Sequence, residues 1–374
     1  MGATDVSVIH VDTERGWRGG QQQAAYLFRY MLDEGVRTHF ICRRRSRMED
    51  YLRVQGLPYH SEPLSGEMDL LSAGRIARFA ARGGYRVLYL HSGHAVSIGL
   101  LARLMNRGLR TIAVRRVDFS IGANPASRLK YATGLVDRIV AVSENVRDVL
   151  VGDGIHPSRV EVIRSGIDIH RFDDVEPDPS LRSELGVPLD GVLVGTVAGM
   201  VGHKDYPTLL KASERVIAAE PGVFFVAVGS GPEERKVRAL ADSLRLDGRF
   251  RFLGERRDVG AVLKAMDVFV LASKMEGLGT SVLDAMSVGL PIVATEAGGI
   301  PEMVDDGGNG LLVPSEAPDS LSDAIIALAR DSEMRQAFGS RSRERVREFD
   351  YRLMGARSLK LCRSLPFRPS GRRP

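Results

Sequence analysis

Short apolar, β-branched runs alternate with segments of helical periodicity along the whole chain of 374 residues. This alternation is typical of βαβ units, in which helices join successive parallel strands. The strands that we expect fall into two groups of six. They cover residues 6–11, 38–42, 87–90, 111–114, 139–142 and 160–163, and then 192–197, 224–228, 251–253, 268–271, 291–294 and 311–313. The pattern therefore predicts an α/β protein with parallel sheets.

The length of the chain indicates two domains, because 374 residues exceed one ordinary core and suit two α/β domains. Between the two groups of strands lies the segment DIHRFDDVEPDPS, residues 168–180, which is polar, contains two prolines and has no periodicity. Such a segment predicts a linker. We place the N-terminal domain at residues 1–170 and the C-terminal domain at residues 171–348.

Composition narrows the protein class. A hydrophobic content of 44% and a charged content of 26% are those of a globular protein. No apolar stretch reaches the roughly 18 to 20 residues that span a bilayer, and the N-terminus lacks the apolar core of a signal peptide. Cys42 and Cys362 are far apart and without metal-type spacing, which fits a reducing compartment. We expect a cytoplasmic protein.

The net charge is +5, and arginines cluster at 43–45, 115–116, 256–257 and 368–373. These clusters are either an ordinary solvated surface or a means of attracting an anionic membrane or phosphate-bearing substrates. A nucleic-acid partner is not expected, because no aromatic-and-basic RNA motif or zinc spacing accompanies the charge.

Residues 273–314 carry the most chemistry. Glu276 sits in a glycine-punctuated loop, and Asp284 follows on an expected helix. An apolar strand comes next, and then a second glycine turn, AGGIPE. At both loop-to-helix junctions, free backbone N–H groups and the positive end of the helix dipole favour phosphate. Carboxylates accept hydrogen bonds from sugar and ribose hydroxyls, so this run predicts a nucleotide-sugar site.

The same run resembles the signature of family 4 of the retaining glycosyltransferases, also called glycosyl transferases group 1. That signature has a glutamate, seven residues, a second acidic residue, a "GxPVVA…GGxPE" segment and a glycine-rich close. One departure is Asp284, where the family usually has glutamate. The matching residues are Glu276, Gly277, Gly279, Ala285, Met286, Gly289, Pro291, Gly298, Gly299, Pro301, Glu302, Gly310 and Leu312.

The resemblance implies the GT-B fold, in which two doubly wound, Rossmann-like domains face a cleft. Residues 1–170 would be the acceptor-side domain, and residues 171–348 would bind the nucleotide sugar. Enzymes of this kind return their last helix to the first domain, and residues 349–365 are the candidate for that helix.

The resemblance also implies roles in the second domain. Lys204 would contact the donor diphosphate, although the arginine that often follows the preceding Gly199 is replaced by Met200. Glu276 would hold the donor sugar, and Asp284 the ribose. Two non-functional interpretations stay open. Lys204 could be an ordinary surface charge, and Glu276 could be an acidic residue that stabilises the dipole at a helix start. Further binding positions are Gly231, Leu253 and the backbone N–H groups of Leu278, Gly279 and Thr280.

In the first domain, Gly19 and Gly20 precede an amphipathic helix, where the family uses paired glycines near the donor phosphate and acceptor. An ordinary turn would look alike. His91 and His94 follow the strand at 87–90, whereas many relatives carry a cleft histidine after the next strand, where this chain has Arg116. Any of His91, His94 and Arg116 could be the polar group near the anomeric carbon, and His94 joins Lys204 and Glu276 as a candidate catalytic residue.

The chain has no Asp-x-Asp triplet, so we expect no metal and no other cofactor. The predicted function is metal-independent transfer of a sugar, with retention, from a nucleoside-diphosphate-sugar donor to a glycan or lipid-linked acceptor. Resemblance to bacterial members that build envelope polysaccharide or lipopolysaccharide suggests peripheral contact with the anionic inner membrane. The alternatives are a nucleotide-sugar epimerase or hydrolase, and a non-catalytic nucleotide-sugar-binding scaffold subunit.

Overall fold

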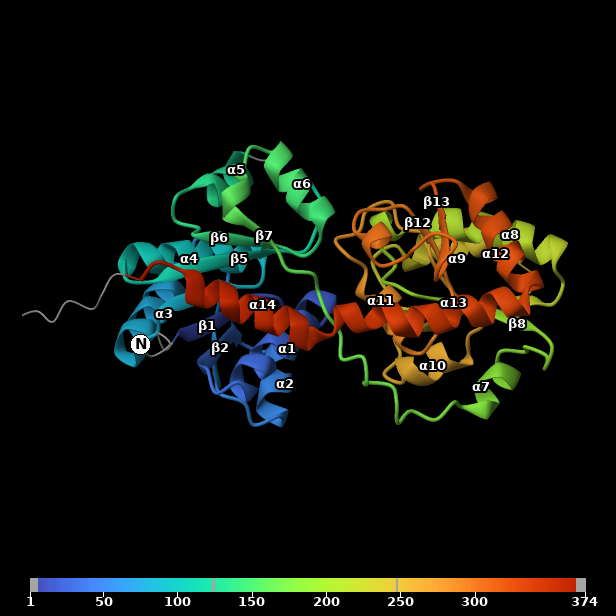
Figure 1. The fold of residues 1–374 in the computed structure, drawn as a ribbon, viewed down its shortest axis with the longest axis horizontal. Coiled ribbons are helices and arrows are strands. Elements are labelled where there is room, and N and C mark those ends of the chain that lie inside the picture. Colours follow the sequence, from blue (N-terminus) through green and yellow to red (C-terminus); the bar gives the residue numbers. More distant parts are fainter. Residues whose placement is uncertain (1–5, 123–124, 247, 368–374) are drawn as a thin grey trace, which may run out of the picture. The chain divides into compact units, whose positions relative to one another are not determined.

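The computed structural model describes residues 6–122, 125–246 and 248–367, so the arginine cluster at 368–373 lies outside the described residues. The chain forms two compact units (Figure 1). Unit 1 comprises Met1–Ile167 and Tyr351–Pro374, and unit 2 comprises Asp168–Asp350. No helix among the described residues combines the length and the apolar character needed to cross a membrane.

Unit 1 is built on a parallel sheet of seven strands in the order β3-β2-β1-β4-β5-β6-β7. The order reverses between β1 and β4, and ligands of such sheets bind beyond the carboxyl ends of the strands near that reversal. The strands are β1 (Ser7–Asp12), β2 (Arg37–Arg43), β3 (Tyr59–Glu62), β4 (Val87–Leu90), β5 (Arg110–Arg115), β6 (Arg138–Ala141) and β7 (Val160–Val162).

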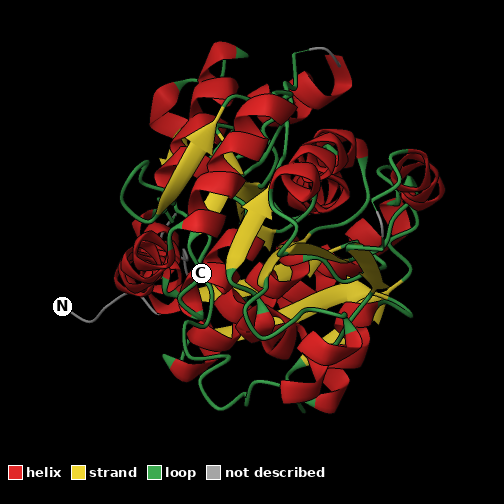
Figure 2. Ribbon diagram, turned by 90° about the vertical axis from the view of Figure 1, so that its right-hand side faces the viewer, coloured by secondary structure: helices red, strands yellow, loops and turns green. Residues whose placement is uncertain are grey.

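The helices of unit 1 lie on both faces of this sheet, because right-handed crossovers run in both directions from the order reversal. Figure 2 draws helices red and strands yellow. The helices are α1 (Gly19–Asp33), α2 (Arg47–Val54), α3 (Leu70–Gly83), α4 (Gly93–Met105), α5 (Pro125–Ala132), α6 (Glu144–Gly152) and α14 (Tyr351–Ser364). The last helix, α14, packs on α1, where the rings of Tyr26 and Tyr351 stack at 4.9 Å. Gly355 makes this approach possible, because a Cβ there would lie 2.3 Å from the ring of Tyr30.

Unit 2 repeats the architecture with a sheet of six strands in the order β10-β9-β8-β11-β12-β13, which reverses between β8 and β11. The strands are β8 (Val192–Val197), β9 (Val223–Val228), β10 (Phe250–Gly254), β11 (Val268–Leu271), β12 (Ile292–Thr295) and β13 (Gly310–Val313). The helices are α7 (Pro179–Glu184), α8 (Tyr206–Ala219), α9 (Glu234–Ser243), α10 (Val259–Ala265), α11 (Thr280–Ser287), α12 (Pro318–Arg330) and α13 (Ser332–Arg345).

The predicted fold class is confirmed, since both sheets are parallel and doubly wound. Each of the twelve expected strands is present with its ends within one residue of the prediction. One strand was missed, the edge strand β3, whose sequence YHSE is polar and lies between prolines. An edge strand buries little apolar surface, and so it leaves a weak pattern in the sequence.

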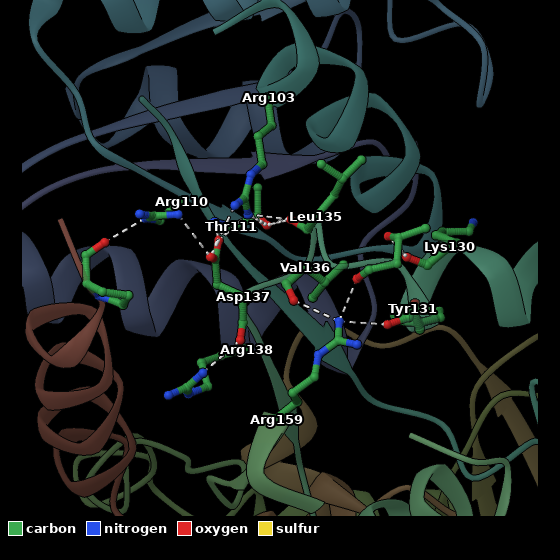
Figure 3. Close-up of polar contacts among 12 residues, drawn as sticks. Arg103, Arg110, Thr111, Lys130, Tyr131, Leu135, Val136, Asp137, Arg138 and Arg159 are labelled. Atoms are coloured by element: carbon green, nitrogen blue, oxygen red, sulfur yellow. Dashed lines mark hydrogen bonds and ion pairs between the residues drawn. The ribbon is translucent and has the colours of Figure 1, made fainter. Parts of the chain in front are cut away.

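A polar network holds the amino ends of β5 and β6 together (Figure 3). Asp137, directly before β6, accepts a hydrogen bond from the backbone N–H of Thr111 at 2.8 Å. Its carboxylate also pairs with Arg103 and, at 3.4 Å, with Arg110. Asp267 in unit 2 does the same before β11, accepting from the N–H of Leu193 at 2.7 Å. In each unit, one aspartate thus locks two neighbouring strands.

Arg159 closes the C-terminal end of α5 in the same region (Figure 3). Its guanidinium donates to the carbonyls of Tyr131, Ala132, Thr133 and Val136 at 2.7 to 3.0 Å. These carbonyls lie at and just after the helix end, where they lack intrahelical partners and where a cation complements the dipole.

Candidate functional site

The loops that follow β8, β9 and β10 lie against one another at the carboxyl edge of the unit 2 sheet. The N–H of Met200 donates to Ser230 O at 2.9 Å, and the N–H of Gly229 donates to Gly254 O at 2.8 Å. Glycine is required at 229, because φ is +135° and a Cβ would lie 2.1 Å from Ala198 O. Three of the predicted binding residues, Gly199, Gly231 and Leu253, belong to this edge.

Lys204 and Glu276 meet at the same edge, from loops on either side of the strand-order reversal. Lys204 ends a short 3₁₀ turn after β8, and Glu276 lies in the loop after β11. The ammonium pairs with Glu276 Oε2, and both side chains are 14% exposed. Ser273 Oγ lies 3.3 Å from the same carboxylate oxygen, so the structure brings together the two residues that the sequence placed on diphosphate and sugar.

Gly279 shapes the entry to α11. Its φ is +93°, in the left-handed region that favours glycine, and a Cβ there would lie 3.2 Å from Glu276 Cγ. Leu278, the residue before Gly279, is buried, and Thr280 is the first residue of α11. The first N–H groups of a helix have no intrahelical acceptor, so α11 begins with donors next to Glu276.

Asp284 lies on α11, just over one turn from its start. Burial raises the pKa of its carboxyl to about 6, and the nearby Arg171 opposes that rise. Arg171 lies in the segment predicted as a linker, with NH1 3.8 Å from Asp284 Oδ2. The sequence reasoning missed Arg171, because no motif surrounds it and its partner is 113 residues away in the chain.

Met200 is fully buried, so an apolar core side chain stands where the family often has an arginine. Another lysine of the loop after β11, Lys274, was not among the predicted site residues, and its charge is already matched by carboxylates. Its backbone N–H donates to His203 O at 2.8 Å, and its ammonium pairs with Glu316 at 2.7 Å and lies 3.7 Å from Asp205. The signal was present, since Lys274 stands two residues before Glu276 in the motif.

In unit 1, three side chains form a chain of contacts at the carboxyl edge of the sheet. Arg116 donates to His91 O at 2.6 Å and contacts His91 Nδ1 at 3.1 Å, while His91 Nε2 contacts His10 Nδ1 at 2.9 Å. A guanidinium can only donate. His91 Nδ1 is therefore the acceptor, His91 Nε2 carries the proton, and His10 Nδ1 accepts it. Burial lowers the pKa of both histidines, that of His10 to about 3, which keeps them neutral.

Asp12 and Gly20 complete this cluster. Burial raises the pKa of Asp12 to about 6, which the charge of Arg116 partly offsets, and Gln21 donates to its carboxylate at 3.3 Å. A Cβ at Gly20 would lie 3.4 Å from Arg116 Cδ, so the glycine leaves room for the arginine beside α1. The predicted residues Gly19, Gly20, His91 and Arg116 thus gather around the start of α1.

His94 lies apart from this cluster. Its exposed ring is on the first turn of α4, with Nε2 3.7 Å from Glu67, a carboxylate that also pairs with Lys130. Among the described residues, no group of three or more His, Cys, Asp or Glu side chains is arranged to hold a metal ion.

Two family models match the chain. Residues 17–171 match "Glycosyltransferase Family 4", and residues 178–345 match "Glycosyl transferases group 1". A D-inositol 3-phosphate glycosyltransferase of Corynebacterium efficiens is 30% identical over 305 residues, which are 75% of this chain and 72% of that protein.

A GDP-mannose-dependent monoacylated alpha-(1-6)-phosphatidylinositol monomannoside mannosyltransferase of Corynebacterium glutamicum is 32% identical over 57% of this chain and 58% of its own length. Among solved structures, Anabaena HepE in complex with UDP-glucose superposes with a TM-score of 0.83 at 20% identity, covering 96% of this chain and 100% of that chain. The likeness to HepE shows a shared fold.

Proposed function

The chain belongs to family 4 of the glycosyltransferases, and from that premise we propose that it moves a hexose-type sugar, with retention, from a nucleoside-diphosphate donor to a glycan or lipid-linked acceptor. The observation that carries the proposal is the pairing of Lys204 with Glu276 at the carboxyl edge of the unit 2 sheet. It brings an ammonium, which suits phosphate, next to a carboxylate, which suits sugar hydroxyls.

The site has groups suited to the diphosphate, the sugar and the ribose of such a donor. Lys204 and the N–H groups at the start of α11 would hold the diphosphate, and Glu276 would accept hydrogen bonds from sugar hydroxyls. Asp284 would accept from the ribose. Positive charge at the leaving diphosphate then comes from protein groups, which is why we propose transfer without a metal.

The chemical step we propose is same-face attack. The acceptor hydroxyl forms the new bond at the anomeric carbon as the bond to the diphosphate breaks, and the leaving phosphate oxygen takes the hydroxyl proton. The protein contributes orientation and stabilises the charge that develops on the diphosphate. We assign these roles to Glu276 and Lys204 respectively.

The names of the relatives support a polar acceptor that contains an inositol ring or is attached to lipid, and HepE binds UDP-glucose. We therefore propose that the enzyme works in the cytoplasm, with peripheral contact to an anionic membrane that carries the acceptor. The epimerase, hydrolase and scaffold alternatives are not favoured, since the relatives carry glycosyltransferase names.

Calorimetry with UDP, GDP, ADP and their common sugar conjugates tests the donor site. We expect one nucleotide to bind selectively and its sugar conjugate to bind more tightly, with the additional affinity of the conjugate lost in Glu276→Ala. If no conjugate binds, or if Glu276→Ala binds the conjugate as tightly as the wild type, the proposed donor site is wrong.

A further inference from the structure

Charge is distributed very unevenly in unit 1. Residues 70–117 include nine arginines and no lysine, aspartate or glutamate. The net charge of the whole chain is +5, so the rest of the chain is net negative, at −4. This stretch covers α3, β4, α4 and β5; three of its arginines lie on α3, and Arg107 follows the end of α4.

The outward side of α3 combines these arginines with apolar side chains. Arg75, Arg78 and Arg82 are exposed and follow Leu71 at steps of four, three and four residues, which places all four on one side of the helix. Leu71 is 76% exposed, and Met68, just before the helix, is 75% exposed. The opposite side of α3 faces the core.

The end of α4 extends this surface. Leu104 and Met105 are each more than half exposed, at 53% and 52%, and Arg107 follows on the surface. The two helices pack side by side (Figure 1). A Cβ added at Gly74 would lie 3.7 Å from Met105 Sδ, so the thioether rests against α3 close to Leu71 and Arg78. The α3–α4 face comprises Met68, Leu71, Arg75, Arg78, Arg82, Leu104, Met105 and Arg107.

Two of the acidic groups nearest to this face pair with cations, and a third, Asp69, caps α3 through hydrogen bonds from Ser65 and Ser72. Glu62 pairs with Arg75 at 2.9 Å, and Glu67 pairs with Lys130 at 3.1 Å. Arg78, Arg82 and Arg107 come from the acid-free stretch, and they give the face a net positive charge next to its methionines and leucines.

We propose that the α3–α4 face docks on an anionic lipid bilayer, with the arginines at the headgroups and Met68, Leu71, Leu104 and Met105 inserted among the acyl chains. Helices that lie in a membrane interface have this combination of basic and long aliphatic side chains. The inference deepens the membrane contact in the proposed function by naming the surface that makes it.

The face offers no stacking platform for a nucleic acid. Phe79, the aromatic residue of α3, packs on His39 at 4.8 Å and on His60 at 4.6 Å. Single-stranded nucleic acid is bound by exposed aromatic rings beside basic groups, whereas this face presents flexible aliphatic side chains.

Flotation of the full chain with vesicles tests the proposal. We expect binding to vesicles of phosphatidylglycerol and phosphatidylcholine in equal parts, and none to phosphatidylcholine alone. Arg78→Glu with Arg82→Glu should lower the partition coefficient about thirtyfold or more, since each basic residue near an anionic surface contributes about fivefold. Leu71→Ser with Met105→Ser should lower it about tenfold.

The matched control is Arg235→Glu with Lys236→Glu on α9 of unit 2, which makes the same change in charge at two exposed positions and should leave vesicle binding unchanged. The proposal is overturned if no variant differs from the wild type, if the control loses binding equally, or if Leu71→Ser with Met105→Ser binds normally. If Leu71→Ser with Met105→Ser binds vesicles normally and Arg78→Glu with Arg82→Glu loses binding to RNA, the face is a binding surface for polyanions instead.

An assay of sugar transfer to a soluble acceptor, with no vesicles present, separates this inference from the proposed function. The α3–α4 variants should keep wild-type turnover with such an acceptor. Vesicle binding that follows the α3–α4 face supports the docking surface even if no transfer is found, and in that case only the proposed function is wrong.

Discussion

Lys204 and Glu276 form an ion pair across 72 residues of sequence, between the loops that follow β8 and β11. Each was predicted to bind a different part of one donor, the diphosphate and the sugar. Their contact places an ammonium and a carboxylate side by side at the carboxyl edge of the sheet. It also means that a diphosphate must compete with the Glu276 carboxylate for the Lys204 ammonium.

This competition predicts opposite effects for the two kinds of ligand in Glu276→Gln. The free nucleoside diphosphate should bind as tightly as to the wild type or more tightly, because the Lys204 ammonium loses its carboxylate partner. The sugar conjugate should lose affinity, because an amide accepts hydrogen bonds from sugar hydroxyls less strongly. Calorimetry with both ligands measures the difference, and equal losses for the two would refute the separate roles.

Lys204→Ala should lower kcat by about a hundredfold or more, because one charged group is lost from the developing diphosphate charge. Lys211→Ala, an exposed lysine on α8, is the control and should leave kcat unchanged. Steady-state kinetics at saturating donor measures both. Wild-type kcat in Lys204→Ala would exclude a role for this cation in the reaction.

Donor affinity should depend on the protonation of Asp284. Its pKa is raised to about 6, and only the ionised carboxylate accepts from both ribose hydroxyls, so affinity should fall about tenfold per pH unit below 6. Asp284→Asn should bind more weakly at neutral pH, with affinity that stays flat from pH 5 to pH 7. An identical pH profile in the two proteins would contradict the assignment.

The same group affects stability with a definite sign. Because the pKa in the folded state lies above the ordinary value of 3.8, the folded chain holds more protons than the unfolded chain between pH 3.8 and about 6. The contribution of Asp284 to the free energy of unfolding therefore falls as pH rises through this window. Asp284→Asn should remove that slope in urea unfolding of the chain.

Arg116→Lys should lower turnover by about tenfold or more, although it keeps the charge. A lysine cannot reproduce the fork by which Arg116 reaches both His91 O and His91 Nδ1. Arg115→Lys is the adjacent control, since the Arg115 guanidinium donates to Phe119 O instead. Equal effects of the two substitutions on kcat and KM would show that Arg116 has no special position.

Asp137→Ala should destabilise the chain by roughly 3 to 5 kcal/mol, because it leaves the largely buried Arg103 without its carboxylate. Asp50→Ala removes one partner of an exposed ion pair with Arg53 and should leave the unfolding midpoint nearly unchanged. Urea unfolding followed by circular dichroism measures both changes. Equal midpoints for the two variants would refute a structural role for the Asp137 network.

The sequence contained most of the fold, because buried parallel strands need continuous apolar runs and those runs are visible. The strand at Tyr59–Glu62 escaped because an edge position does not demand apolar residues. The segment at 168–180, predicted as a linker, belongs to unit 2, and its Phe172 is buried beside Gly260. Hydrophobic periodicity does not reveal a single apolar residue of this kind.

The site was only partly readable. Glu276 and Lys204 were predicted from the motifs that surround them, and the structure pairs their side chains. Arg171 and Asp12 became visible only in three dimensions, because their importance comes from a partner rather than from neighbours in sequence. His94 is close to His91 in sequence, yet its ring lies beside Glu67 rather than with His91 and His10.

Sugar transfer itself is the most direct test. UDP-, GDP- and ADP-sugars would be incubated with the wild type and with Glu276→Ala, using D-inositol 3-phosphate and phosphatidylinositol as acceptor probes, and the glycosylated product quantified by mass spectrometry. We predict one donor consumed with an equal amount of product, and a rate at least about a hundredfold lower in Glu276→Ala. Donor consumed without any product, or an equal rate in the variant, would contradict glycosyl transfer at this site.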